Sequence, residues 1–232
     1  TSSIKLCHSQ GKLSLGIVFD GDGDRIAAVD EQGRFCSTQA LIPLFLEHLV
    51  TVKKLRGSFI KTVSGSDLMR LVAESLSTEV IELSVGFKYI AAKMRSTNIL
   101  LGGEESGGIG FGNHLPERDA LYSALMLLEV IACSGKPLGV LVDDMKLRFG
   151  ESYYDRIDIH LTDMESRKRA EHHILKNPPK RIFDNLVTEV VSTDGLKLII
   201  APMNWLMFRF SGTEPLLRIY CEAPTSKQLK DN

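Results

Sequence analysis

The sequence has little that would mark it for a membrane, for nucleic acid or for export. Its 28 Lys and Arg balance 29 Asp and Glu, so it lacks the basic excess that nucleic-acid binders show. No apolar run approaches the roughly 18 residues that suggest a membrane span. The first ten residues lack the basic and apolar regions of a signal peptide. We therefore expect small-molecule partners, no nucleic acid and no membrane.

Cysteine is also scarce, and its spacing excludes two further classes of protein. The four cysteines are far apart in 232 residues and form no C-x-x-C pair. That pattern favours isolated reduced thiols over a disulfide framework or a zinc site, and it predicts a cytoplasmic location. His172 and His173 are adjacent, so on a helix they would point to different sides; we interpret them as a solvated surface.

Residues 1 to about 150 alternate short apolar runs with amphipathic stretches, which is typical of α/β layers. The expected strands are Leu13–Phe19, Ile26–Val29, Phe59–Val63, Val80–Leu83 and Ile99–Leu101. The expected helices are Gln39–Val50, Asp67–Leu76, Lys88–Arg95 and Asp119–Ala132.

After Gly150 the pattern changes to that of a small α+β domain. A possible capping box, Thr162 with Glu165, predicts a helix that runs to about Lys176. Asp194-Gly195 is a strong hairpin signal between two strand-like runs. The expected strands are Tyr153–His160, Val187–Ser192, Leu196–Ala201, Trp205–Phe210 and Leu216–Cys221.

Three carboxylates alternate with glycine directly after the apolar run Gly16–Phe19. Asp20, Asp22 and Asp24 would repel one another unless a cation lay between them, and the intervening glycines let the backbone fold so that they converge. A hard divalent cation such as Mg²⁺ is the natural occupant, because it takes oxygen ligands and leaves positions open for a phosphate. The loop therefore predicts a magnesium site suited to phosphoryl chemistry.

Two other kinds of site have carboxylates in a similar pattern. An EF-hand would need glycine where Arg25 stands, and helical flanks, so we reject it. An aspartyl-nucleophile phosphatase would use Asp20 as nucleophile and Asp22 as acid/base, with Asp143-Asp144 imitating its distal metal motif. Asp24 stands where that class places Thr or Val. The phosphatase remains an alternative.

Two further loops could carry chemistry. Gly102–Gly112 has no P-loop lysine, but Glu104 and Ser106 on a glycine frame suit hydrogen bonding to adjacent sugar hydroxyls. The segment 209–215 combines an Arg fork, two hydroxyls and backbone N–H groups around a glycine, and this predicts an anion site fit for a phosphate monoester.

In this order and spacing, the three loops resemble those of the α-D-phosphohexomutases, the family of phosphoglucomutases, phosphomannomutases and phosphoglucosamine mutases. The resemblance implies a three-layer α/β/α domain followed by a smaller α+β domain. It implies that residues 1–35 are the end of the family's domain 2, 36–150 its domain 3, and 151–232 its domain 4, truncated at its end. The implied partners are a hexose phosphate and the preceding domains of the same enzyme.

The resemblance also implies roles for individual residues. Arg25 and Arg118 would support catalysis, with Arg118 standing where the family commonly has lysine. The implied metal ligands are Asp20, Asp22 and Asp24, and the implied substrate-binding residues are Gly86, Phe87, Lys88, Glu104, Ser106, Arg209, Ser211, Gly212 and Thr213.

One motif of the family is missing from this sequence, which changes what the chain alone could do. Family members transfer a phosphoryl group through the serine of a Ser-His-Asn-Pro-type loop, with Mg²⁺ and a hexose 1,6-bisphosphate activator, and no such loop occurs here. We expect a fragment that is inactive alone; a non-catalytic sugar-phosphate binding module is a further alternative. Glu105 and the Gly-Phe-Lys segment favour glucose or mannose phosphate as substrate.

Overall fold

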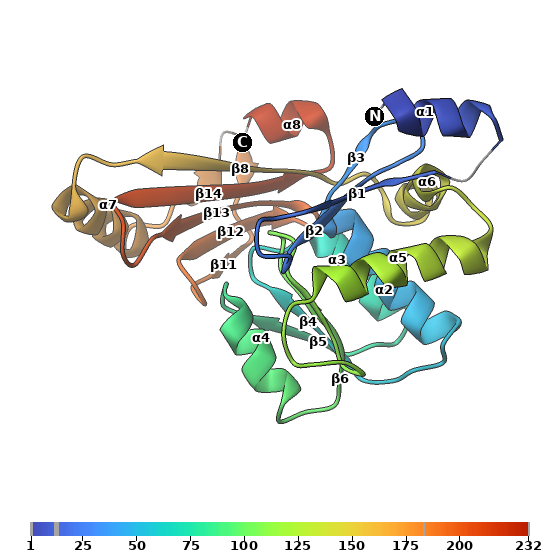
Figure 1. The fold of residues 1–232 in the computed structure, drawn as a ribbon. Helices are drawn as coiled ribbons and strands as arrows, with labels where there is room; N and C mark the ends of the chain where they lie inside the picture. The colour runs from blue at the N-terminus through green and yellow to red at the C-terminus, as the bar shows by residue number, and fades with distance from the viewer. Residues whose placement is uncertain (1, 12–13, 183, 232) are drawn as a thin grey trace. The chain divides into compact units, whose positions relative to one another are not determined.

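The computed structural model describes residues 2–11, 14–182 and 184–231, and the chain divides into two compact units. The first contains residues 1–150 and the second residues 151–232. Each unit has its own sheet and its own helices (Figure 1).

The first unit is built on a four-stranded sheet with the order β5-β4-β6-β7. β4 runs parallel to both β5 and β6, while β7 is antiparallel to β6, as expected of a reversal through a tight loop. The strands are β4 Ser58–Thr62, β5 Val80–Leu83, β6 Ile99–Gly103 and β7 Ile109–Phe111, and the helices are α1 Ser2–Ser9, α2 Thr38–Thr51, α3 Asp67–Ser75, α4 Phe87–Met94, α5 Ala120–Ser134 and α6 Leu138–Phe149.

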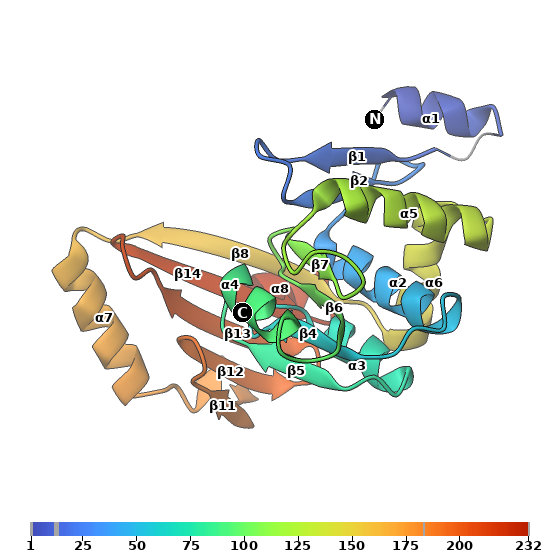
Figure 2. The same cartoon turned by 60° about the horizontal axis from the view of Figure 1, so that its bottom comes forward.

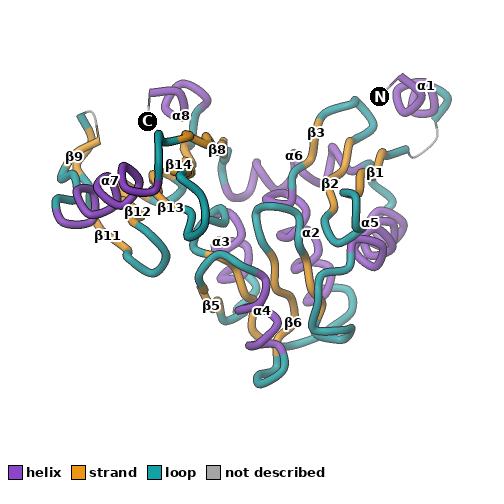
Figure 3. The backbone as a smooth tube through the Cα atoms, turned by 60° about the vertical axis from the view of Figure 1, so that its left-hand side comes forward, coloured by secondary structure: helices purple, strands orange, loops and turns teal. Residues whose placement is uncertain are grey.

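Two consecutive glycines at the end of β6 show that helices cover both faces of this sheet. A Cβ on Gly102 would meet Ile90 of α4 at 2.5 Å, whereas one on Gly103 would meet Ile42 of α2 at 2.3 Å. Because successive residues of a strand point to opposite faces, α4 and α2 lie on opposite sides of the sheet (Figure 3). The unit is therefore an α/β/α sandwich, and β6 needs glycine where the helices approach most closely.

A separate three-stranded antiparallel sheet precedes the sandwich in the chain. It contains β1 Gly16–Phe19, β2 Ile26–Val29 and β3 Phe35–Cys36, with β2 in the middle. Ile26 and Ala28 of β2 are buried, and β2 lies beside α5 (Figure 2). The hairpin that joins β1 to β2 is residues 20–25, so this small sheet positions the three predicted metal ligands.

The second unit contains a five-stranded antiparallel sheet with the order β11-β12-β13-β14-β8. A separate two-stranded ribbon is formed by β9 and β10. Ile174 of α7 and Leu229 of α8 both pack against the cluster around Leu198 and Leu206, so both helices cover the same face. The elements are β8 Tyr153–His160, α7 Met164–Lys176, β9 Arg181–Ile182, β10 Asn185–Leu186, β11 Glu189–Val191, β12 Leu196–Ala201, β13 Asn204–Phe210, β14 Leu216–Ala223 and α8 Ser226–Asp231.

The α/β class predicted from the sequence is confirmed, and most expected elements are present within a residue or two. Leu13, where one strand was expected to begin, lies outside the described residues. The predicted capping box is wrong. Helix α7 begins after Asp163, whose carboxylate accepts a hydrogen bond of 2.7 Å from Ser166 N, so Asp163 caps the helix and Thr162 does not. Helices α1 and α6 were not predicted.

Among the described helices, none is by itself long and apolar enough to cross a membrane. α5 and α6 meet that criterion only as a pair, and they are bent by 79° at the break between them. Seven residues of α5 are buried inside the protein, including Met126 and Leu127, whereas its Leu121, Leu125 and Leu128 are exposed.

Candidate active site

The Asp20–Arg25 hairpin holds its three carboxylates together. One ligand oxygen from each of Asp20, Asp22 and Asp24 lies within 4.8 Å of the others. Asp20 Oδ1 accepts hydrogen bonds from the backbone N–H of Asp24 (3.2 Å) and of Arg25 (3.1 Å), which closes the turn. Gly23, with φ of +73°, supplies the left-handed backbone that this turn requires. The clustering expected from the sequence is therefore present.

The pKa values of two carboxyl groups in this hairpin, Asp20 and Asp24, are shifted in opposite directions. Desolvation acts to raise the pKa of Asp20, but hydrogen bonds from Arg25 outweigh it and hold that pKa well below its usual range. The pKa of Asp24 is raised, first by desolvation and then by the neighbouring carboxylates, against the opposing charge of Arg118. The two arginines therefore offset only part of the negative charge of the three carboxylates, and further positive charge beside them would be stabilising.

One oxygen of Asp24 shows that a cation fits this cluster. Asp24 Oδ2 lies 2.6 Å from Arg118 Nη2, while Oδ1 of the same carboxylate is buried, makes no hydrogen bond among the described residues and lies 3.5 Å from Arg25 Nε. A buried carboxylate oxygen without a hydrogen bond is costly, and a bound metal ion would satisfy it. The donor set consists of hard oxygens alone, which suits Mg²⁺. The residues present therefore fit a magnesium ion.

The Glu104–Gly108 turn lies directly beside this hairpin. Arg25 forms an isolated antiparallel bridge with Gly108, and Ile26 N donates a hydrogen bond of 3.1 Å to Gly107 O. Gly107, at φ +111°, could not carry a Cβ without meeting Ile26 O at 3.0 Å. The structure therefore brings two of the predicted loops to one place, with Arg25 and Gly108 83 residues apart in sequence.

Glu104 lies under this turn as a buried carboxyl group. Glu104 is 5% exposed, and its Oε1 accepts a hydrogen bond of 3.0 Å from Gly86 N. Burial raises the pKa of Glu104 to about 7, the charge of Glu105 adds to the increase, and Arg118 opposes it. This carboxyl can consequently accept or donate a hydrogen bond near neutral pH.

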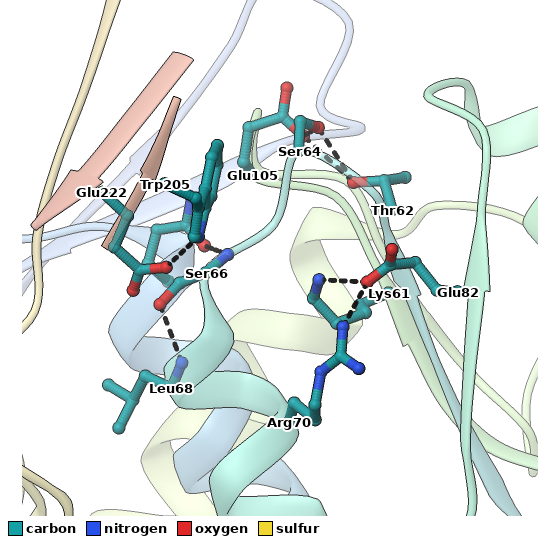
Figure 4. Close-up of polar contacts among 11 residues, drawn as sticks. Lys61, Thr62, Ser64, Ser66, Leu68, Arg70, Glu82, Glu105, Trp205 and Glu222 are labelled. Atoms are coloured by element: carbon teal, nitrogen blue, oxygen red, sulfur yellow. Dashed lines mark hydrogen bonds and ion pairs between the residues drawn. The ribbon is translucent and has the colours of Figure 1, made fainter. Parts of the chain in front are cut away.

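Glu105 and Ser106 complete the turn. Glu105 accepts hydrogen bonds from Thr62 Oγ1 (3.2 Å) and Ser64 Oγ (2.8 Å), so it is held against the end of β4 (Figure 4). Ser106 is exposed at the tip of the turn. The turn therefore presents one exposed hydroxyl beside one buried carboxyl.

The Gly86–Lys88 segment divides into residues with different surroundings. Gly86, with φ +132°, caps α4 and binds Glu104 through its N–H. The side chain of Phe87 is buried with Ile60 and Ile90, and the centre of its ring lies 5.6 Å from the Arg118 guanidinium. Lys88 is exposed, with its ammonium 4.9 Å from the centre of the Tyr89 ring.

The second unit contains the remaining predicted loop. Arg209 Nε donates a hydrogen bond of 2.9 Å to Asp194 Oδ2, and its side chain is 20% exposed. Desolvation acts to lower the pKa of Arg209, but Asp194 raises it, so the guanidinium stays charged. Ser211 is buried, whereas Gly212 and Thr213 are exposed, and Thr213 N lies 3.4 Å from Ser211 Oγ.

Two residues around this loop were missed by sequence reasoning. Arg167 of α7 donates a hydrogen bond of 2.9 Å from Nε to Ser211 O, and its side chain is only 11% exposed. Glu171 lies four residues after Arg167, and in the sequence the two residues resemble an ordinary ion pair on a helix surface. Asp194 was noticed only as a turn residue, and nothing in its local sequence indicated that it would bind Arg209.

Models of two protein-family domains together match most of the chain. "Phosphoglucomutase/phosphomannomutase, alpha/beta/alpha domain III" matches residues 38–148, and "Phosphoglucomutase/phosphomannomutase, C-terminal domain" matches residues 163–231. The chain belongs to the α-D-phosphohexomutase family, and the parts matched are the C-terminal domains of that family's members.

Individual relatives agree with this assignment. A phosphoglucosamine mutase of Levilactobacillus brevis is 31% identical over 96% of this chain, and the chain spans 45% of that protein. A putative phosphomannomutase from Thermus thermophilus has the same fold, with a TM-score of 0.78 and 27% identity over 99% of this chain and 46% of its own. An Aspergillus fumigatus N-acetylphosphoglucosamine mutase, solved with GlcNAc-6P and magnesium, shares the fold alone, with a TM-score of 0.62 and 16% identity over 94% of this chain and 50% of its own.

The structure does not support the aspartyl phosphatase. Asp143 and Asp144, its expected distal metal motif, lie inside α6, where they pair with Arg34 and Lys136. Asp20, its expected nucleophile, accepts hydrogen bonds through both carboxylate oxygens. Within the described residues, neither Asp143 nor Asp144 joins the Asp20 cluster.

Proposed function

We propose that this chain supplies the metal-binding, sugar-binding and phosphate-binding parts of a magnesium-dependent phosphohexomutase. The reaction would interconvert a hexose 1-phosphate and a hexose 6-phosphate. The observation that carries the proposal is the meeting of the Asp20–Arg25 hairpin with the Glu104–Gly108 turn, where a buried carboxylate oxygen of Asp24 makes no hydrogen bond to any described residue and only an ion pair of 3.5 Å with Arg25.

Each part would have a separate task. Asp20, Asp22 and Asp24 would hold Mg²⁺, which when bound offsets the negative charge of phosphoryl oxygens. Arg25 and Arg118 would add positive potential beside it, because Arg118 contacts Asp24 and Arg25 contacts Asp20.

The substrate would be recognised through two groups of residues. Glu104 and Ser106 would bind hydroxyls of the sugar ring, helped by the backbone of Gly86 and by the exposed Lys88. Arg209, Ser211, Gly212 and Thr213 would bind the phosphate that is not reacting. Binding of that phosphate would orient the sugar without contributing to the chemical step itself.

The chain spans about half the length of the curated relatives it matches, so the rest of the reaction is assigned to sequence outside it. We assign residues 1–35 to the end of domain 2, 36–150 to domain 3 and 151–232 to domain 4. The phosphoserine that exchanges its phosphoryl group would come from the preceding domains, with a hexose 1,6-bisphosphate as activator. We also propose that the protein works in the cytoplasm, where its cysteines would remain thiols.

The hexose remains a prediction. The sequence favours glucose or mannose phosphate, whereas the relative from Levilactobacillus brevis is a phosphoglucosamine mutase. A carboxyl with a pKa of about 7, as Glu104 has, can pair with either a hydroxyl or an ammonium. Comparing the binding of glucose, mannose and glucosamine 6-phosphates to the purified chain would rank the three sugars.

Turnover and binding together test the proposal. The chain is incubated with Mg²⁺, glucose 1-phosphate and glucose 1,6-bisphosphate, and glucose 6-phosphate is followed by ³¹P NMR. We expect no turnover by the chain alone, but saturable sugar-phosphate binding that is weakened in Arg209→Ala. Robust turnover would contradict the assignment of the nucleophile to absent domains. Release of inorganic phosphate that Asp20→Asn abolishes would favour a phosphatase.

A further inference from the structure

A second group of metal-ligating side chains lies on the helical layer of the first unit. His48 comes from α2, and Glu129 and Cys133 come from α5. Glu129 and Cys133 are four residues apart, so they share one face of their helix. One ligand atom from each of the three residues lies within 4.8 Å of the other two. None of these residues has a role in the proposed mutase chemistry.

His48 is the buried member of the group. Its side chain is 4% exposed, and its Nε2 makes no hydrogen bond within the described residues, although Glu129 Oε1 lies 3.3 Å away. A buried imidazole nitrogen without a hydrogen bond is costly, as a buried polar group of any kind is. The nitrogen that lacks a bond is also the one that faces Glu129.

Space is available beside these side chains. A cavity of about 180 Å³ is lined by His48 and Cys133, together with Leu44, Thr51, Val52 and Leu141. Cys133 is a free, exposed thiol, and the side chain of Glu129 is 39% exposed. Both can therefore rotate to shorten the ligand distances towards the roughly 2.0–2.3 Å bonds that zinc makes, and a water molecule could take a fourth position.

We propose that His48, Glu129 and Cys133 bind one Zn²⁺ ion. Imidazole nitrogen, thiolate sulfur and carboxylate oxygen are the three ligand types that zinc accepts, and the sulfur distinguishes this site from the all-oxygen Asp20 cluster. The Cys133 thiol would lose its proton to solvent on binding. One thiolate and one carboxylate then balance the two charges of the ion.

Lys53 should weaken zinc binding at this site, so a variant without its ammonium should bind zinc more tightly. Its ammonium lies 2.9 Å and 3.0 Å from the two carboxylate oxygens of Glu129. Zinc and Lys53 compete for the same carboxylate, and their positive charges repel one another. Removing the ammonium should therefore strengthen zinc binding, whereas removal of a ligand should weaken it.

The experiment is a competition titration of the full chain with Zn²⁺ against a chromophoric chelator. We expect one zinc site per chain, weakened by about 100-fold or more in Cys133→Ser, since even outer partners of metal ligands are worth 10–100-fold. Lys53→Gln should bind zinc several-fold more tightly. Because His48 is buried and its substitution could disturb folding, the exposed Cys133 carries the test. Cys7→Ser serves as a matched thiol control and should bind like the unmodified chain.

Cobalt gives a second measurement, in which the spectrum itself reports the sulfur ligand. Co²⁺ bound at this site should show thiolate-to-metal charge-transfer absorption, and Cys133→Ser should lack it. Asp22→Asn should retain it, which separates this site from the Asp20 cluster and from the proposed mutase function. Equal zinc affinity in Cys133→Ser and the unmodified chain, or a cobalt spectrum without the thiolate band, would overturn the proposal.

Discussion

Arg118 and Asp24 form an ion pair in which the guanidinium contacts only one of the two carboxylate oxygens. Arg118 Nη2 lies 2.6 Å from Asp24 Oδ2, while Oδ1 is buried, makes no hydrogen bond in the described part of the chain and lies 3.5 Å from Arg25 Nε. Arg118 thus offsets part of the charge of Asp24 and leaves Oδ1 available to a metal ion. Although it is 94 residues away in the chain, Arg118 should therefore limit the metal affinity of the hairpin.

The first prediction concerns this pair. In Arg118→Gln, the positive charge next to the site is lost, so we expect divalent-metal affinity to rise about tenfold, since unit charges about 4 Å apart interact by roughly 1 kcal/mol even in water. Arg118→Lys keeps the charge and should differ much less. Mn²⁺ titration monitored by electron paramagnetic resonance measures both. Weaker metal binding in Arg118→Gln would show that Arg118 organises the site more than it competes with the metal.

The second prediction is a dependence of stability on pH. Burial raises the pKa of Glu104 from 4.5 to about 7, so the folded chain holds this proton more tightly than the unfolded chain. The stabilisation is therefore greatest at acidic pH and is lost as the pH rises through 7. Relative to Glu104→Gln, the unmodified chain should lose about 2 kcal/mol of unfolding free energy between roughly pH 5 and pH 8. Urea unfolding followed by circular dichroism tests this, and parallel pH curves for the two proteins would contradict it.

The third prediction concerns Gly195, in the hairpin between β11 and β12. Its φ is +91°, and an added Cβ would lie 2.2 Å from Phe208 O. Gly195→Ala should therefore lower the unfolding free energy of the second unit by about 2 kcal/mol or more. Trp205 is the only tryptophan and is buried in the same sheet, where it donates to Glu222 (Figure 4), so its fluorescence reports unfolding of this unit.

Gly212 supplies the matched control for that experiment. A Cβ on Gly212 would meet nothing within 4 Å, so Gly212→Ala should change stability by less than about 0.5 kcal/mol. Equal losses in the two variants would mean that glycine content, and not the close approach at Gly195, determines the effect.

The fourth prediction concerns Arg209 and Asp194. Asp194 binds the guanidinium that we assign to phosphate, so Asp194→Asn should tighten binding of glucose 6-phosphate several-fold. Arg209→Ala should weaken it by about tenfold or more, the value of a hydrogen bond to a charged group. Arg169→Ala, an exposed arginine of the same unit, should leave affinity unchanged. Calorimetric titration measures all three, and a loss of affinity in Asp194→Asn would show that Asp194 orients Arg209 for its ligand.

Local patterns predicted the elements whose formation depends on local sequence. Val80–Leu83 and Leu196–Ala201 are strands as expected, because each is a short apolar run bounded by polar or turn residues. The three carboxylates of Asp20, Asp22 and Asp24 also converge as expected, since the spacing and the glycines are contained in one hairpin.

Contacts that depend on the tertiary fold could not be predicted in this way. The bridge from Arg25 to Gly108 and the hydrogen bond from Arg167 to Ser211 join residues far apart in sequence, and nothing near either residue indicates its partner. Phe87 packs against Ile60 and Ile90, which its local sequence does not indicate, and its expected contact with the substrate stays a prediction. The His48 cluster likewise joins two helices whose cysteine and histidine spacing carries no metal signature.

The most direct test of the account is residue-resolved detection of a cation at the Asp20–Arg25 hairpin. Mn²⁺ is added to ¹⁵N-labelled protein, and paramagnetic broadening is measured for the unmodified chain and for Asp22→Asn. Asp22 is the exposed ligand, so its substitution disturbs the turn less than that of Asp20 or Asp24. We predict selective broadening of the amides of residues 20–25 and 107–108, which Asp22→Asn abolishes. Broadening that is absent there in the unmodified chain, or that persists unchanged in Asp22→Asn, would contradict the assignment of this hairpin as the metal site.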